Sequence, residues 1–75
     1  MHNISTVVHA DPEILGGTPV FIGTRVPVRI LFEYLAAGDR VEEFLDAFPS
    51  VRREQVVAVL GLAEGLVTDR ARSPR

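Results

Sequence analysis

Hydrophobic residues between positions 28 and 67 recur three or four positions apart, which is the spacing of one face of an α-helix. The spacing holds over three stretches, residues 28–37, 39–48 and 52–67, and predicts three amphipathic helices. Their stripes consist, in chain order, of Val28, Leu31, Phe32 and Leu35; of Val41, Phe44, Leu45 and Phe48; and of Val56, Val59 or Leu60, Ala63, and Leu66 or Val67.

The residues between these stretches carry signals that end and begin helices. Gly38 stands where a glycine commonly closes a helix in the left-handed conformation. Asp39, with Glu42 three residues later, has the spacing of a capping box and predicts the start of the second helix. Pro49 predicts its end, because proline cannot continue the backbone ladder. Ile30 and Tyr34 lie beside the first stripe and widen the apolar surface beyond the need of one small core.

The first third of the chain lacks helical spacing and is rich in glycine, proline and β-branched residues. Residues 4–9 and 19–22 predict two short strands, which we expect to pair. Tight turns are predicted on both sides of the second strand, at Gly16-Gly17 and at Gly23-Thr24. Pro27 suits the first turn of the helix that follows. A two-stranded ribbon is marginal in water, so it needs helices behind it or a second copy of the chain.

The composition indicates one small domain. Seventy-five residues, 47% of them hydrophobic, suffice for a single core. We expect that domain to span residues 1–69 and residues 70–75 to form a disordered basic tail. The absence of cysteine excludes disulfides and thiolate metal sites. No apolar run approaches the roughly 20 residues that cross a bilayer, and no signal pattern opens the chain, so a soluble, cytoplasmic protein is predicted.

Catalytic chemistry finds little support in the sequence. His2 and His9 have no glutamate or cysteine at metal-ligand spacing. Ser5, His9 and Asp11 stand too close together to indicate a triad, and neither a nucleophile elbow nor a phosphate-binding loop is present. We therefore expect no enzyme activity, no catalytic residues, no metal and no cofactor.

The three predicted helices, the last two joined across residues 48–51, match a helix-turn-helix. The predicted fold class is thus mostly α, a three-helix helix-turn-helix domain of the winged-helix or homeodomain kind with a short N-terminal β-ribbon. In that motif the start of the second helix of the pair reads the major groove. The candidates there are Arg52, Arg53 and Gln55, whose types pair with guanine and adenine. The alternative is an ordinary helix start with surface side chains.

Arg25 and Arg29 are further candidates for phosphate contact. Arg25 has an alternative role, in which it bonds backbone carbonyls, Asp11 or Glu13 and so ties down its turn, and we favour that structural role. The net charge of −2, with eight arginines, no lysine and ten acids, weighs against strong DNA binding by a single copy. We therefore expect DNA binding to need a homodimer or a complex with another protein.

Two ordered series in the chain carry a family resemblance. They are Ile14-Leu15-Gly16-Gly17-Thr18-Pro19 and Ile22-Gly23-Thr24-Arg25-Val26-Pro27-Val28. Together with Ile30-Leu31, Leu35-Ala36-Ala37-Gly38, Glu42-Glu43 and Phe48-Pro49, they closely resemble the family catalogued as domain of unknown function 433, as far as about Ala63. That family usually has Ser or Thr where this chain has Arg52, so Ser50 is an alternative cap for the last helix.

Members of that family resemble small, VapB-like helix-turn-helix antitoxins. The resemblance implies an antitoxin that binds and inhibits a PIN-like ribonuclease toxin and, through DNA binding, represses its own operon. In the toxin contact Leu60, Leu62 and Leu66 would anchor the partner. Arg70, Arg72 and Arg75 would reach the carboxylates that hold magnesium in such a nuclease.

Two other functions remain open at this point. One is a stand-alone helix-turn-helix DNA-binding regulator, and the other is a homodimeric interaction module without DNA binding. Gly61 and Gly65, four residues apart in the last helix, either let another helix approach closely or are merely tolerated there.

Overall fold

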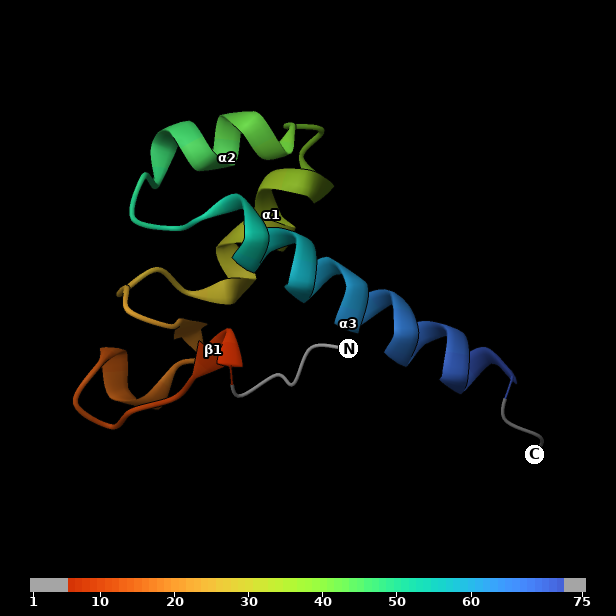
Figure 1. Cartoon of the computed structure of the whole chain (residues 1–75), viewed down its shortest axis with the longest axis horizontal. Coiled ribbons are helices and arrows are strands. Elements are labelled where there is room, and N and C mark those ends of the chain that lie inside the picture. Colours follow the sequence, from red (N-terminus) through yellow and green to blue (C-terminus); the bar gives the residue numbers. More distant parts are fainter. Residues whose placement is uncertain (1–5, 73–75) are drawn as a thin grey trace.

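The computed structural model describes residues 6–72, in which it contains three helices and one short β-ribbon (Figure 1). In chain order the elements are strand β1 (Val8–His9), the 3-10 turn η2 (Leu15–Gly17), strand β2 (Val20–Phe21), and the helices α1 (Val28–Ala36), α2 (Val41–Ala47) and α3 (Arg53–Arg72). The predicted fold class is confirmed as mostly helical with an N-terminal antiparallel ribbon. No helix in the described part is long and apolar enough to cross a membrane.

The ribbon is antiparallel, with Val8 opposite Phe21 and His9 opposite Val20. Of the predicted strand over residues 4–9, only Val8 and His9 are in β1; Thr6 lies in a 3-10 segment and Val7 in a turn, and residues 4 and 5 lie outside the described residues. β2 limits the ladder, since Pro19 has no N–H to donate on one side and a turn starts at Ile22 on the other. β-branched composition thus marked the strand but could not set its length.

The chain after β2 folds back along the strand's other edge. Phe21 donates its N–H to the Val26 carbonyl at 3.1 Å, and Val28 donates to the Pro19 carbonyl at 3.0 Å. The predicted Gly23-Thr24 turn is confirmed, with Gly23 at φ 77°. β2 therefore has neighbours on both edges, and Val20 and Phe21 are fully buried.

Helix α1 begins at Val28, the first residue of the predicted stretch 28–37. Pro27 is the N-cap, with extended backbone at φ −64° and ψ 136°, and not a residue of the first turn. Gly38, whose φ is 92°, follows the C-cap Ala37 and closes the helix as predicted. Gly38 donates to the Leu35 carbonyl at 3.1 Å and Asp39 donates to the Tyr34 carbonyl at 2.9 Å, which is the Schellman pattern.

The capping box predicted from Asp39 and Glu42 is wrong by one residue. Arg40 is the N-cap of α2, and its backbone N–H donates to the Glu43 carboxylate at 2.6 Å. Because the backbone N–H of Asp39 already closes α1, the next helix can begin only after it. The three-residue spacing of a capping box fits both Asp39 with Glu42 and Arg40 with Glu43. The end of α1 decided in favour of the second pair.

The core lies where α1, α2, the first half of α3 and the ribbon meet. Its fully buried side chains are Phe21, Phe44, Leu31, Val20 and Val56. An aromatic cluster surrounds Phe44, whose ring centroid lies 5.1 Å from that of Phe48, 5.6 Å from Tyr34 and 6.0 Å from Phe21. This cluster explains why α2, a helix of 7 residues, holds its place.

One predicted stripe is rotated in the structure. Ile30 and Tyr34, expected to add surface, pack against the core, whereas Phe32, expected inside, is 38% exposed. Helix α1 is covered on two sides, by α2 and by the ribbon with α3, so its buried arc is wider than one 3.6-residue stripe. The spacing of apolar residues predicted helix α1 itself, but it did not predict which flank of the helix the neighbouring elements would cover.

Helix α3 is longer than predicted. It starts at Arg53 and continues five residues beyond Val67 to Arg72, so residues 70–72 are helical and not part of a disordered tail. Once a helix is formed, each further residue adds one backbone hydrogen bond, and polar residues can extend it without any burial. Residues 73–75 lie outside the described part of the chain.

Candidate functional site

Gln55 clamps the start of α3 to the turn that follows β2. Its side chain is almost fully buried, and its Nε2 donates to the Ile22 carbonyl at 3.0 Å. Its Oε1 accepts the backbone N–H of Arg52 at 2.9 Å, which satisfies a donor that the helix itself leaves unpaired. One amide thus caps α3 and fixes it against a segment 33 residues away in sequence.

The predicted role of Gln55 in base recognition is therefore wrong. A glutamine that reads adenine needs both amide atoms free at the protein surface. Here both atoms are bonded inside the protein and the residue is 4% exposed. The same bonds show that Gln55, and not Ser50, caps the helix, since Ser50 makes no hydrogen bond within the described residues.

The clamp joins the two segments that carry the candidate arginines Arg25 and Arg52. Arg52 precedes α3 and Arg25 lies three residues beyond Ile22, so the Gln55 side chain bridges the segments that carry them. Both residues are exposed, and within residues 6–72 neither guanidinium makes a hydrogen bond or ion pair. We call Arg25 and Arg52 the arginine corner.

The favoured structural role of Arg25 is wrong. Thr24 ties down the turn, because its hydroxyl donates to the Phe21 carbonyl at 2.8 Å and accepts the Val26 N–H at 3.0 Å. Asp11, one of the predicted partners of Arg25, instead accepts the Glu13 backbone N–H at 2.9 Å. Arg25 is thus left with its charge facing solvent, as phosphate contact would require.

The other two candidate arginines are paired with glutamates at the surface. Arg53 lies 3.6 Å from Glu42 of α2, and Arg29 lies 2.9 Å from Glu33 one turn along α1. All four side chains are more than half exposed, so these pairs can open to solvent. Glu54, two residues after Arg52, is also exposed, and the corner alone is not a basic patch.

A second candidate surface lies on α3, which we divide into a proximal half, residues 53–62, and a distal half, residues 63–72. The stripe of Val56 and Val59 is buried against the core. At the same three- and four-residue spacing it continues into the distal half, where Leu66 is 58% and Val67 is 66% exposed. We call Ala63, Leu66, Val67 and Arg70 the distal stripe.

The predicted partner-binding residues divide between these two halves. Leu60 and Leu62 are half-buried and pack against the core, so they offer little free surface. Leu66, Arg70 and Arg72 lie exposed in the distal half, with both arginines in the last turn. Figure 1 shows this end of α3 extending beyond the body formed by the other elements. Arg75 lies outside the described residues.

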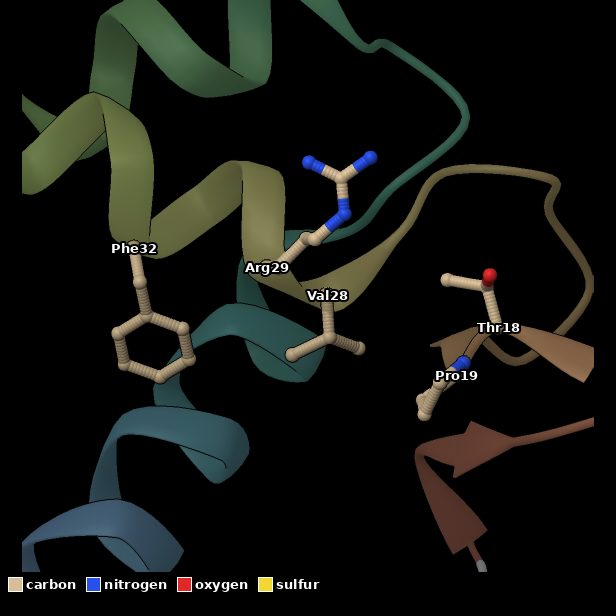
Figure 2. A pocket seen from close by; sticks show the side chains of 5 residues that line it. All are labelled: Thr18, Pro19, Val28, Arg29 and Phe32. Carbon is tan, nitrogen blue, oxygen red and sulfur yellow. The ribbon is translucent and has the colours of Figure 1, made fainter.

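An apolar groove of about 300 Å³ lies between the start of β2 and the start of α1 (Figure 2). Its lining residues are Thr18, Pro19, Val28, Arg29 and Phe32. Helical spacing assigned Phe32 to the core, so the sequence did not indicate this groove. Among the residues that the structure describes, no three histidine or acidic side chains gather closely enough to hold a metal ion.

Comparison with known proteins gives a family but no activity. Residues 8–63 match the family model described as "Protein of unknown function (DUF433)". An uncharacterized protein, y4eO, of Sinorhizobium fredii (strain NBRC 101917 / NGR234) is 50% identical over 50 residues. That match covers 67% of this chain but only 23% of y4eO, so the chain spans under a quarter of that relative's length. No solved structure matches significantly.

Proposed function

Because the chain belongs to the DUF433 family, which its sequence motifs already resembled, we propose that it acts as the antitoxin of a type II toxin–antitoxin pair, with a PIN-like ribonuclease as its partner. The observation that carries the proposal is the distal stripe. An exposed apolar helix face with arginines at its end is the kind of surface that a partner protein covers.

The chemistry of the contact follows from the two kinds of side chain on the distal half of α3. Leu66 and Val67 would enter an apolar groove of the nuclease, as the exposed face of an amphipathic helix does. Arg70 and Arg72, one turn further along, would then pair with the carboxylates that hold magnesium in such a nuclease. Occupied carboxylates cannot bind the metal, and the nuclease would be inactive.

The test is co-expression with the product of an adjacent reading frame of the nuclease type, followed by purification of the complex and an RNA-cleavage assay. We expect the partner to be toxic alone and inactive in a stable complex with this protein. Leu66→Glu should break the complex, and the double variant Arg70→Ala/Arg72→Ala should leave RNA cleavage partly restored. Val57→Glu is the matched control, because Val57 is also 58% exposed but precedes the distal half.

A nuclease that remains fully active in the presence of this protein would refute the antitoxin proposal. The stand-alone regulator or the homodimeric interaction module would then take its place. If the complex forms but the arginine variant inhibits as well as the natural chain, the arginines have no part in inhibition and the apolar stripe alone would account for binding.

DNA binding is the second activity that we propose, and the arginine corner is the observation that favours it. Arg25 and Arg52 belong to segments that Gln55 holds together, and their guanidinium groups are free to contact phosphate or a base edge. Since the chain carries a net charge of −2, one copy would bind weakly, and a homodimer or toxin-bound complex would bring several corners to one operator.

Operator binding can be measured by fluorescence anisotropy with the upstream DNA of the gene over a range of salt concentrations. Arg25→Ala and Arg52→Ala should each weaken binding and reduce the salt dependence by about one phosphate contact. Arg40→Ala is the control, because its side chain is exposed at the start of α2, away from the corner's segments. An unchanged salt slope in both variants would remove the corner from the DNA interface.

A further inference from the structure

We propose that two copies of the free protein associate through the distal half of α3, with the two helices antiparallel and the twofold axis between Leu66 and Val67. The proposed contact concerns the protein without its nuclease and does not depend on the proposed function. If a nuclease binds the same stripe, it would have to displace the second copy.

The starting observation is that one helix face is covered along only half its length. Val56, Val59, Ala63, Leu66 and Arg70 follow one another at alternating steps of three and four residues, the spacing at which helices pair side by side. Val56 and Val59 are 0% and 4% exposed, but Leu66 and its neighbour Val67 are 58% and 66% exposed. The face that builds the core therefore continues for about 15 Å beyond it with no cover from the described residues.

The arrangement of charges along the distal half favours a second copy in antiparallel orientation. This half carries two acids, Glu64 and Asp69, and two bases, Arg70 and Arg72, so a second copy brings no net repulsion. With the axis between Leu66 and Val67, Arg70 of one copy lies opposite Ala63 of the other, and Glu64 is next in the chain. In a parallel pair Arg70 would instead face its own copy, which like charges disfavour.

The side-chain sizes fit the same register. Leu66 and Val67 of both copies would meet around the axis and form the apolar centre of the contact. Ala63 is small and leaves room for the methylene stem of Arg70 to lie across it while the guanidinium reaches Glu64 of the other copy. Such a seam is short compared with the roughly 1,200 Å² of a stable interface, so the dimer should be weak and depend on concentration.

Analytical ultracentrifugation of the full chain over a concentration series tests the association. The average mass should rise from monomer toward dimer, and Leu66→Glu should keep the protein monomeric with an unchanged helical circular-dichroism spectrum. Val57→Glu, at an equally exposed position of the proximal half, should dimerise like the natural chain. A monomer at every concentration, or equal loss in both variants, would overturn the proposal.

Orientation and register have separate tests. Arg70→Glu and Glu64→Arg should each weaken the dimer several-fold, and the double variant should recover it, because the charges then pair again in exchanged places. Since the chain has no cysteine, Val67→Cys should form a disulfide-linked dimer on mild oxidation, whereas Val57→Cys should not. No recovery in the double variant, or equal cross-linking at both positions, would contradict the antiparallel contact.

Discussion

The two halves of α3 have one hydrophobic spacing and two environments. In the proximal half Val56 and Ala58 are buried and Gln55 clamps the helix to the turn after β2. In the distal half Leu66 and Val67 keep more than half of their surface in water. An apolar stripe therefore shows which side of a helix is suited to burial, but not which other segment packs against it.

The difference also separates two kinds of candidate residue. In the proximal half, a polar side chain that looked like a DNA contact, Gln55, is part of the internal structure. In the distal half, Leu66 and Val67 of the predicted stripe are part of the surface, and Leu66 was already a candidate for partner contact. Both outcomes depend on which residues the tertiary fold places opposite each half of the helix.

The largest contrast is expected between two leucines. Leu31 is fully buried in the core that the proximal half completes, and Leu31→Ala should lower the free energy of unfolding by about 3 kcal/mol. Leu66→Ala should lower it by less than about 0.5 kcal/mol, since its side chain is mostly solvated. Urea denaturation of both variants at low protein concentration measures the difference. Equal losses would mean that the distal half is also part of the core.

The Gln55 clamp should come next. Gln55→Ala leaves the Ile22 carbonyl and the Arg52 N–H without their partner, and we expect a loss of about 2 kcal/mol in the free energy of unfolding. Arg52→Ala, which leaves the backbone N–H in place, should change it by less than about 0.5 kcal/mol. Thermal denaturation followed by circular dichroism compares the two. A Gln55→Ala variant as stable as the natural chain would exclude the clamp.

A smaller effect of opposite sign is expected in the distal half. Gly65→Ala should stabilise the helix by about 0.5–1 kcal/mol, because alanine is the better helix former and a Cβ there meets no atom within 4 Å. The same holds for Gly61→Ala in the proximal half. Thermal melts test both variants. A lower melting temperature for Gly65→Ala alone would show that this glycine packs closely against another chain.

The smallest effect concerns the ion pair that links α2 to the start of α3. Arg53 and Glu42 are 3.6 Å apart but both more than half exposed, so solvent and salt screen their attraction. A double-mutant cycle with Arg53→Ala and Glu42→Ala should give a coupling below about 0.5 kcal/mol that vanishes in high salt. A coupling above about 1 kcal/mol would show that this pair helps to hold the proximal half in place.

Much of the local structure could be predicted from single stretches of sequence. The end of α1 follows from Gly38, the turn after β2 from Gly23 and Thr24, and the aromatic centre of α2 from the spacing of Phe44 and Phe48. Each of these depends on residues no more than a few positions apart, and their conformational preferences act whatever surrounds them. The family could be predicted for the same reason, because its motifs are contiguous.

The remaining features depended on residues that meet only in the folded chain. The cap of α2 moved to Arg40 because the end of α1 used Asp39, and the exposure of Phe32 depended on which flank of α1 was covered. Arg25 was not needed to tie down its turn because the Thr24 hydroxyl bonds both Phe21 and Val26 there. The single backbone N–H of Asp39, once bonded to the Tyr34 carbonyl, cannot also be bonded by a glutamate at the start of the next helix.

By itself the sequence determined three helices, the glycine turns around β2 and the apolar face of each helix, since these follow from local propensity and periodicity. Only the tertiary structure decided that Gln55 would join α3 to a turn 33 residues away. It also decided that the apolar stripe of α3 would be buried at Val56 and Val59 but exposed at Leu66 and Val67. The physical reason is that burial depends on which segments pack against one another, and the spacing of residues within one helix does not specify its packing partners.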